Sequence, residues 1–170
     1  MRTRRKGSGL PEPHTPWEEI VPGLWMGGHY WLDGAGTVHP VVADGRFDVV
    51  VSLFVRPDHG PPPGVDHRVA EIPDGPLTAE QLVTVRKLAQ GAAQDVAEGR
   101  RVLVRCYAGF NRSGLVVGQT LVDLGHSPAE AVDLIRRRRS RHALHNGLFA
   151  QYLTTGLDVA ALLAGLDAPS

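Results

Sequence analysis

The sequence predicts an α/β domain with a mainly parallel central sheet of about four to five strands, flanked by helices. Strands are expected at residues 47–54, 66–72 and 101–105, and longer segments with helix-start signals lie between and after them. Strands that alternate with helices favour layers built around a parallel sheet. A length of 170 residues is enough for one domain with a substantial core.

The strand signals begin near the N-terminus. Residues 19–27 predict a short hairpin, and the continuous apolar run at 47–54 predicts a buried strand. A loop rich in proline and glycine, residues 58–66, then separates this strand from the next one. The carboxyl ends of parallel strands meet at one edge of a sheet, where ligands of such folds usually bind.

Capping signals predict where the helices begin. Residues 78–81 and 127–130 are capping boxes, in which a Thr or Ser and a Gln or Glu three positions later bond each other's backbone amides. The first of these helices is expected to reach about Glu98. Another helix is expected at 112–124, and Asn146 is expected to cap a final helix that runs to about residue 164.

Residues 1–16 are rich in glycine, proline, serine and basic side chains, so a mobile N-terminal tail is expected there. Residues 17–170 are expected to form a single domain. Four of the first six residues are basic, and weak binding to acidic partners is the alternative to a merely solvated tail.

Composition excludes several classes of protein. The 18 basic and 18 acidic side chains balance, so no overall charge draws the chain to nucleic acid or to a membrane surface. A single cysteine rules out an internal disulfide and fits a reducing, cytoplasmic location. His142 and His145 are spaced as a possible metal pair, but no nearby carboxylate or thiol completes a site, so no metal or cofactor is expected.

The only cysteine, Cys106, opens the most informative segment, the run CYAGFNRS at 106–113. An apolar strand leads into this run and a helix follows it. Such a loop between strand and helix binds a phosphate dianion, because its N–H groups and the helix N-terminus point at the anion. Arg112 would clamp two oxygens, and the same positive field favours the reactive thiolate. A buried structural cysteine or a redox sensor are the alternatives.

The pattern C-x-x-G-x-x-R-S after a strand resembles the signature of the cysteine-dependent protein tyrosine phosphatases, in their dual-specificity-like branch. That family carries an aspartate general acid on another loop, about thirty residues earlier in compact members, and Asp74 lies 32 positions before Cys106. Residues 19–27, 49–53 and 143–149 also resemble family segments. The resemblance covers roughly residues 17 to 160, so residues 17–170 are expected to be one phosphatase-like catalytic domain.

The resemblance implies a role for each residue of the site. Cys106 is the expected nucleophile, which forms a phosphocysteine that water then hydrolyses. Arg112 is expected to hold the phosphoryl oxygens, and Ser113 to stabilise the cysteine as a leaving group. Asp74 is expected to protonate the leaving oxygen and then to activate the water. The phosphate-binding residues are Tyr107, Ala108, Gly109, Phe110, Asn111 and Arg112, with Gly109 supplying the positive φ of the loop.

Two of these residues also have a purely structural interpretation. Asp74 lies in a Pro-Asp-Gly-Pro sequence typical of an ordinary turn, although its rivals Asp66, Glu71 and Asp95 fall in or beside a strand or on a helix. Ser113 suits a simple helix N-cap.

One residue departs from the family pattern, because Arg105 occupies the place where the family usually has histidine. An arginine there is expected to hydrogen-bond carbonyls of the loop and to add positive charge.

The variable loop positions 107, 108, 110 and 111 hold no Lys or Arg, which argues for a substrate with a single phosphate. Tyr107 and Phe110 either contact an aromatic substrate ring, favouring phosphotyrosine, or only pack. The leading hypothesis is a phosphomonoester hydrolase of the protein tyrosine or dual-specificity type, with a phosphorylated protein or small phosphomonoester as substrate. The alternatives are a phosphoprotein-binding pseudophosphatase and an RNA 5′-phosphatase that uses the basic tail and the arginines at 136–139; neutral net charge disfavours the latter.

Overall fold

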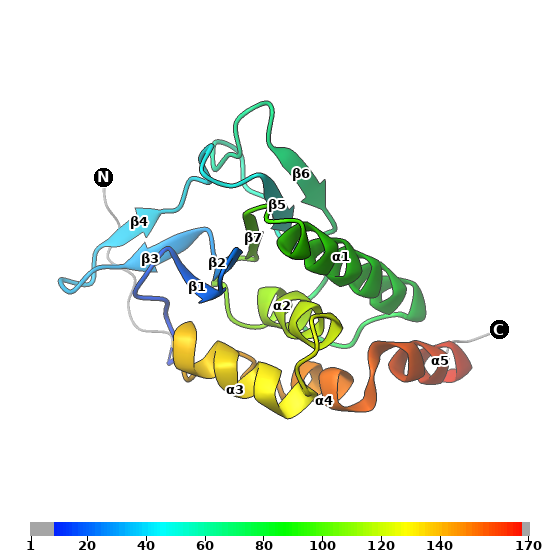
Figure 1. Ribbon diagram of the computed structural model, residues 1–170. Helices are drawn as coiled ribbons and strands as arrows, with labels where there is room; N and C mark the ends of the chain where they lie inside the picture. Colours follow the sequence, from blue (N-terminus) through cyan, green and yellow to red (C-terminus); the bar gives the residue numbers. More distant parts are fainter. Residues whose placement is uncertain (1–8, 168–170) are drawn as a thin grey trace.

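In the computed structural model, which describes residues 9–167, the chain forms a five-stranded sheet with five helices (Figure 1). The strand order is β1–β2–β7–β5–β6. β1 is antiparallel to β2, and the other neighbouring pairs are parallel. The predicted α/β fold with a mainly parallel sheet is therefore confirmed. The strands are β1 (Trp17–Val21), β2 (Leu24–Gly27), β5 (Val49–Ser52), β6 (Asp66–Val69) and β7 (Val102–Arg105).

The two faces of the sheet are covered by different parts of the chain. Successive side chains of a strand point to opposite faces, and in β5 Val49 and Val51 belong to the large core that all five helices share. Val50 and Leu103 belong to a small second core built around Phe47. Figure 1 accordingly shows the helices gathered on one side of the sheet.

Three helices begin where capping signals were predicted: α1 (Ala79–Ala97), α3 (Pro128–Arg138) and α4 (Gly147–Thr155). Both predicted capping boxes are present, Thr78 with Gln81 and Ser127 with Glu130. We call residues 106–113 the cysteine loop. α2 starts at Arg112, near the end of this loop, and its buried face packs between the sheet and the other helices. The helices are α1 (Ala79–Ala97), α2 (Arg112–Asp123), α3 (Pro128–Arg138), α4 (Gly147–Thr155) and α5 (Leu157–Asp167).

The predicted final helix is two helices. Asn146 does cap α4, but that helix ends at Thr155, because Gly156 has a φ of +95° that interrupts the helical backbone. Among the described residues no single helix is long and apolar enough to cross a membrane. α4 and α5 reach that length and hydropathy only together, and they bend by 111° at the break.

A small second sheet was not predicted. It pairs β3 (Tyr30–Leu32) with β4 (Val38–Pro40) in antiparallel register. The connection is stabilised by Asp33, whose Oδ1 accepts hydrogen bonds from the backbone N–H groups of Ala35 (2.9 Å) and Thr37 (3.0 Å). These strands are only three residues long, so the sequence contains no clear periodic pattern that would predict them.

Part of the expected tail packs against the domain. We call residues 10–16 the N-terminal strap. Pro13 of the strap is buried, and its carbonyl accepts a 2.8 Å hydrogen bond from the backbone N–H of Leu32. The packed domain therefore begins before residue 17, while residues 1–8 of the expected tail lie outside the described residues.

Candidate active site

A pocket of about 170 Å³ lies at the carboxyl end of β7. It brings Cys106, Arg112 and Asp74 together, although 38 positions of sequence separate the last two. Five separate segments of the chain form its walls. The lining residues are Leu10, Pro11, Glu12, Tyr30, Asp74, Cys106, Tyr107, Ala108, Phe110, Asn111, Arg112 and His145.

Cys106 follows the last residue of β7 and is only 2% exposed, so the pocket is its route to solvent. Its Sγ lies 3.3 Å from the Oγ of Ser113, within hydrogen-bonding distance. Ser113 is not the N-cap of α2, because that position belongs to Asn111. The Ser113 hydroxyl can therefore donate to the sulfur when the sulfur is negatively charged.

The loop offers backbone donors to an anion. Among the described residues, none of the N–H groups of residues 108–113 has a hydrogen-bond acceptor. Gly109 has a φ of +78°, and a side chain there would collide with the backbone of Gly27. Glycine is therefore required at this position, and the tight loop leaves its donors free for a ligand.

Arg112 is the side chain with an unused buried donor. Its Nη1 donates to the carbonyl of Ile72 at 3.3 Å, and its guanidinium carbon lies 5.6 Å from the centre of the Phe54 ring. Its Nε is buried and has no partner among the described residues. A buried donor without an acceptor costs roughly 1–3 kcal/mol, which an oxyanion in the pocket would recover.

Two amides hold the carboxylate of Asp74 at the pocket. Its Oδ2 accepts from the Nδ2 of Asn111 at 3.0 Å, and its Oδ1 accepts from the Nδ2 of Asn146 at 2.8 Å. Asp74 remains exposed and lines the same pocket as Cys106. The two amides thus hold this carboxylate at the wall of the pocket.

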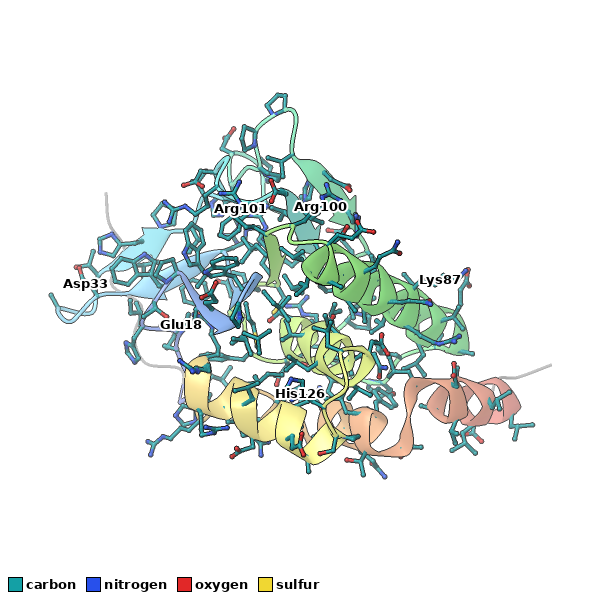
Figure 2. The ribbon with its side chains drawn as sticks, in the orientation of Figure 1. Glu18, Asp33, Lys87, Arg100, Arg101 and His126 are labelled. Atoms are coloured by element: carbon teal, nitrogen blue, oxygen red, sulfur yellow. The ribbon has the colours of Figure 1, made fainter. Side chains whose placement is uncertain are left out.

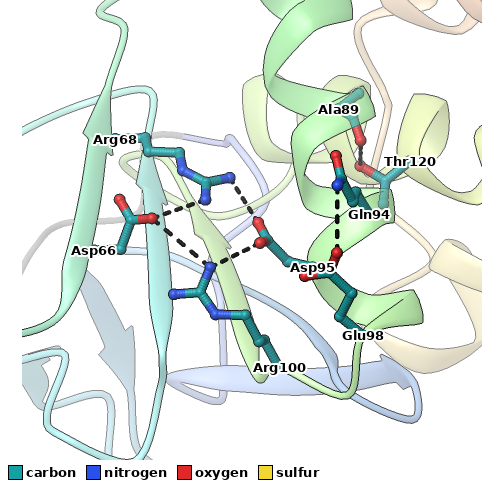
Figure 3. Close-up of polar contacts among 8 residues, drawn as sticks. All are labelled: Asp66, Arg68, Ala89, Gln94, Asp95, Glu98, Arg100 and Thr120. Atoms are coloured by element: carbon teal, nitrogen blue, oxygen red, sulfur yellow. Dashed lines mark hydrogen bonds and ion pairs between the residues drawn. The ribbon is translucent and has the colours of Figure 1, made fainter.

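The rival carboxylates lie elsewhere. Asp66 and Asp95 form a network of ion pairs with Arg68 and Arg100, with distances of 2.6–3.9 Å (Figure 3). Asp66 opens β6 and Arg100 precedes β7, so this network sits at the other end of the strands from the cysteine (Arg100 is also labelled in Figure 2). Glu71 is exposed and does not line the pocket.

The sequence did not reveal the connecting role of Asn111. Besides bonding Asp74, its Nδ2 lies 3.2 Å from the Nε2 of His145, and its Oδ1 accepts from the backbone N–H of Asn146 at 3.0 Å. This buried amide joins the cysteine loop, the Asp74 turn and the start of α4. Asn146 was expected only to cap the final helix. Its side chain does cap α4 and also donates to Asp74.

His145 also lines the pocket. Its Nδ1 lies 2.9 Å from the carbonyl oxygen of His142, and its Nε2 lies 3.2 Å from the Nδ2 of Asn111. Among the described residues, no three or more His, Cys, Asp or Glu side chains are arranged to hold a metal ion.

Arg139 stabilises the cysteine loop through hydrogen bonds to its backbone carbonyls. Its guanidinium donates to the carbonyls of Ala108 (3.2 Å) and Gly109 (3.1 Å), and to the backbone and hydroxyl oxygens of Thr15 in the strap (3.0 and 2.9 Å). Burial lowers its pKa to about 10, so it stays charged at neutral pH. The basic cluster at 136–139, expected to be a solvated helix end, therefore contains one buried structural arginine.

Arg105 was expected to bond carbonyls of the cysteine loop, but it bonds a different loop. It is fully buried, and its guanidinium donates to the carbonyls of His59 (2.8 Å) and Gly60 (2.6 Å) and to the hydroxyl of Ser52 (3.0 Å). These carbonyls belong to the loop between β5 and β6, not to the cysteine loop. Burial lowers the pKa of Arg105 to about 10.

A buried histidine bonds the cysteine loop near Arg105. The backbone N–H of His29 donates to the carbonyl of Tyr107 at 2.8 Å. Its Nε2 lies 2.8 Å from the carbonyl oxygen of Phe54 and its Nδ1 lies 3.1 Å from the Nδ1 of His59. Burial, followed by the charge of Arg105, lowers the pKa of His29 to about 4, so its ring is neutral at neutral pH.

Aromatic rings form one wall of the pocket. The Tyr107 ring lies 4.8 Å from that of Tyr30 and 5.3 Å from that of Phe54, measured between centroids. Phe110 lies under the guanidinium of Arg139, at 5.7 Å. Tyr107 and Phe110 therefore pack against the domain and also line the pocket, and their contact with an aromatic substrate ring stays a prediction.

The fold is shared with solved phosphatase structures. The human DUSP28 structure matches with a TM-score of 0.68 and 22% identity, over 91% of this chain and 100% of that one. OH1, a tyrosine phosphatase from the Orf virus, matches with a TM-score of 0.57 and 18% identity, over 85% and 87%. PTPMT1 in complex with PI(5)P matches with a TM-score of 0.58 and 20% identity, over 83% and 98%.

Comparison of sequences alone finds less, since no protein-family model and no curated protein matches the chain. At identities of 18–22% the structural likeness shows a shared fold. The geometry of the cysteine loop described above comes from the structure of this chain and not from the matched proteins. The family resemblance of that loop predicted the same architecture as the structural match. The chain therefore has the α/β fold of the dual-specificity phosphatases.

Proposed function

We propose that this chain is a phosphomonoester hydrolase of the protein tyrosine or dual-specificity phosphatase type, which acts through a phosphocysteine intermediate. The observation that carries the proposal is the buried Nε of Arg112, which has no partner among residues 9–167, in a pocket where the N–H groups of residues 108–113 also lack acceptors within that range. Donors left unused around a cysteine sulfur suit a tetrahedral oxyanion.

In the first step the Cys106 thiolate attacks phosphorus and the bond from phosphorus to the ester oxygen breaks. The electron pair of that bond goes to the leaving oxygen, which takes a proton from the Asp74 carboxyl group. Arg112 and the loop amides stabilise the charge on the three remaining phosphoryl oxygens.

In the second step water attacks the phosphocysteine and gives a proton to the Asp74 carboxylate. The sulfur–phosphorus bond breaks and its electron pair returns to Cys106 Sγ. The Ser113 hydroxyl, 3.3 Å from that sulfur, donates a hydrogen bond to the departing thiolate. Inorganic phosphate leaves and the site is restored.

The experiment is hydrolysis of p-nitrophenyl phosphate. We expect turnover that a chelator does not change, competitive inhibition by vanadate, and loss of turnover in Cys106→Ser. Restoration of activity by a divalent ion after chelation, or turnover in Cys106→Ser, would contradict the mechanism. Binding of vanadate without any turnover would instead support the pseudophosphatase alternative.

A further inference from the structure

The N-terminal strap forms one wall of the candidate active site. Its residues Leu10, Pro11 and Glu12 line the same pocket as Cys106. The strap is tied to the cysteine loop through Arg139, which bonds both Thr15 and the carbonyls of the loop. The position of the strap is therefore fixed relative to the phosphate-binding groups.

A hydrogen bond fixes the carboxylate of Glu12 at this wall. The Tyr30 hydroxyl donates to Glu12 Oε2 at 2.7 Å, and the Tyr30 ring packs against that of Tyr107. Glu12 is half-buried and no cation pairs with it among the described residues. Its negative charge is thus held beside a pocket that is built to receive an anion.

Carboxylates outnumber cations among the described residues that line the pocket, so the charge of Glu12 affects which substrates fit. In the part of the chain that the structure describes, Arg112 is the only Lys or Arg that lines the pocket, whereas Asp74 and Glu12 both contribute carboxylates. A neighbouring cavity of about 120 Å³ shares Glu12 and Phe110 with the first and adds Glu18, which is labelled in Figure 2. The guanidinium that lines this cavity belongs to Arg139 and is engaged with loop carbonyls and Thr15.

Arg56 is a further cation near the aromatic wall of the pocket, outside its lining. The guanidinium carbon of Arg56 lies 5.4 Å from the centre of the Tyr107 ring and 5.9 Å from that of Phe54. It projects from the loop after β5, whereas Glu12 reaches Tyr107 through Tyr30. Both charges therefore lie near the Tyr107 ring, but Glu12 lines the pocket and Arg56 does not.

We propose that Glu12 is a specificity-determining residue, which makes the site select phosphotyrosine peptides with basic side chains beside the phosphotyrosine. The inference rests on the proposed function and narrows its substrate class. Acidic flanking residues, or a second phosphate, would approach a carboxylate that pairs with no cation among residues 9–167, whereas Lys or Arg would gain an ion pair with it. The aromatic rings of Tyr107 and Phe110 provide the apolar surface on which a tyrosine ring can pack.

The test compares phosphotyrosine peptides that are identical except for Lys, Ala or Glu on both sides of the phosphotyrosine. The measured quantity is the ratio of kcat/KM for the Lys peptide to that for the Glu peptide. We expect a ratio above one in the wild type, by about two- to fivefold per flanking charge, which shrinks when the ionic strength is raised from about 0.01 to about 0.15 M.

Three variants assign the preference to one carboxylate. Glu12→Gln keeps the shape of the side chain and should bring the ratio close to one, and Glu12→Lys should invert it. Arg56→Gln removes the nearby cation and should raise the ratio. Glu98→Gln makes the same charge change at the far end of α1 and should leave the ratio unchanged.

The outcomes separate this inference from the proposed function. Hydrolysis of every peptide with the same ratio in the wild type and Glu12→Gln would overturn the role of Glu12 and leave the phosphatase proposal standing. A preference for acidic flanks in the wild type would do the same. Failure to hydrolyse both the peptides and p-nitrophenyl phosphate would overturn both.

Discussion

Three arginines around the cysteine loop differ in how their donors are used. Arg105 and Arg139 are almost fully buried, and their guanidinium groups donate mainly to backbone carbonyls. Burial lowers the pKa of both to about 10, and both stay charged. Arg112 donates once to the carbonyl of Ile72, and its buried Nε has no partner within residues 9–167.

The difference separates structural arginines from a binding arginine. A guanidinium whose donors are satisfied by the chain stabilises that chain, and its removal leaves buried carbonyls without partners. A guanidinium with an unused donor in a pocket gains most when a ligand arrives. We therefore expect changes at Arg105 and Arg139 to lower stability, and changes in the pocket to lower activity.

The largest effect is expected at Asp74, the pocket carboxylate that two amides hold in place. In Asp74→Asn, kcat should fall by about 10²–10⁴ for an alkyl phosphate, whose poor leaving group needs the proton. It should fall much less for p-nitrophenyl phosphate. Asp66→Asn, in the ion-pair network, should leave both rates unchanged. An equal loss for both leaving groups would place the general acid elsewhere.

Arg112→Lys tests the binding side of the comparison. A lysine keeps the charge but loses the planar fork, so kcat/KM should fall by about 10²–10³. The free energy of unfolding, measured by urea denaturation, should change by less than about 1 kcal/mol, since few contacts within the chain are lost. A large loss of stability in this variant would remove the distinction between Arg112 and the buried arginines.

Arg139→Met tests the structural side. It removes the donors to the carbonyls of Ala108 and Gly109 and to Thr15, so urea denaturation should show a loss of about 2–4 kcal/mol. Arg138→Met, at an exposed neighbouring position, should stay within about 0.5 kcal/mol of the wild type. Equal stability of the two variants would show that the bonds of Arg139 are dispensable.

The free energy of unfolding is expected to depend on pH through His29, the buried histidine near Arg105. The His29 ring takes up a proton near pH 6.5 when unfolded and near pH 4 when folded. Between these values the unfolded chain binds more protons, so acidification destabilises the fold, by about 2 kcal/mol at pH 5. Urea denaturation at pH 7 and pH 5 measures this loss, and it should be smaller in His29→Gln. An identical loss in that variant would exclude His29 as its source.

The sequence predicted those features that have local causes. The capping boxes at 78–81 and 127–130 and the loop at 106–113 each lie within a few consecutive residues, and the fold follows from their order. Local signals failed where glycine ends a helix: Gly156 separates α4 from α5, although a glycine alone does not predict a break.

Contacts between distant segments could not be predicted. Arg139 reaches a carbonyl 30 positions away and the strap 124 positions away, and its neighbours in the basic cluster gave no sign of which arginine would be buried. The role of Asn111 depends in the same way on Asp74 and Asn146, which only the fold brings near. For Arg105 the type of partner was predicted, but the loop that supplies the carbonyls was not.

The most direct test of the unused donor at Arg112 is protection of Cys106 from alkylation. Cys106 is the only cysteine, so iodoacetamide labelling followed by mass spectrometry reports this site alone. We predict that inorganic phosphate slows labelling in the wild type and that Arg112→Lys needs at least about tenfold more phosphate for the same protection, because it loses the bidentate contact. Equal protection in both proteins, or a Cys106 that reacts only after unfolding, would contradict the account.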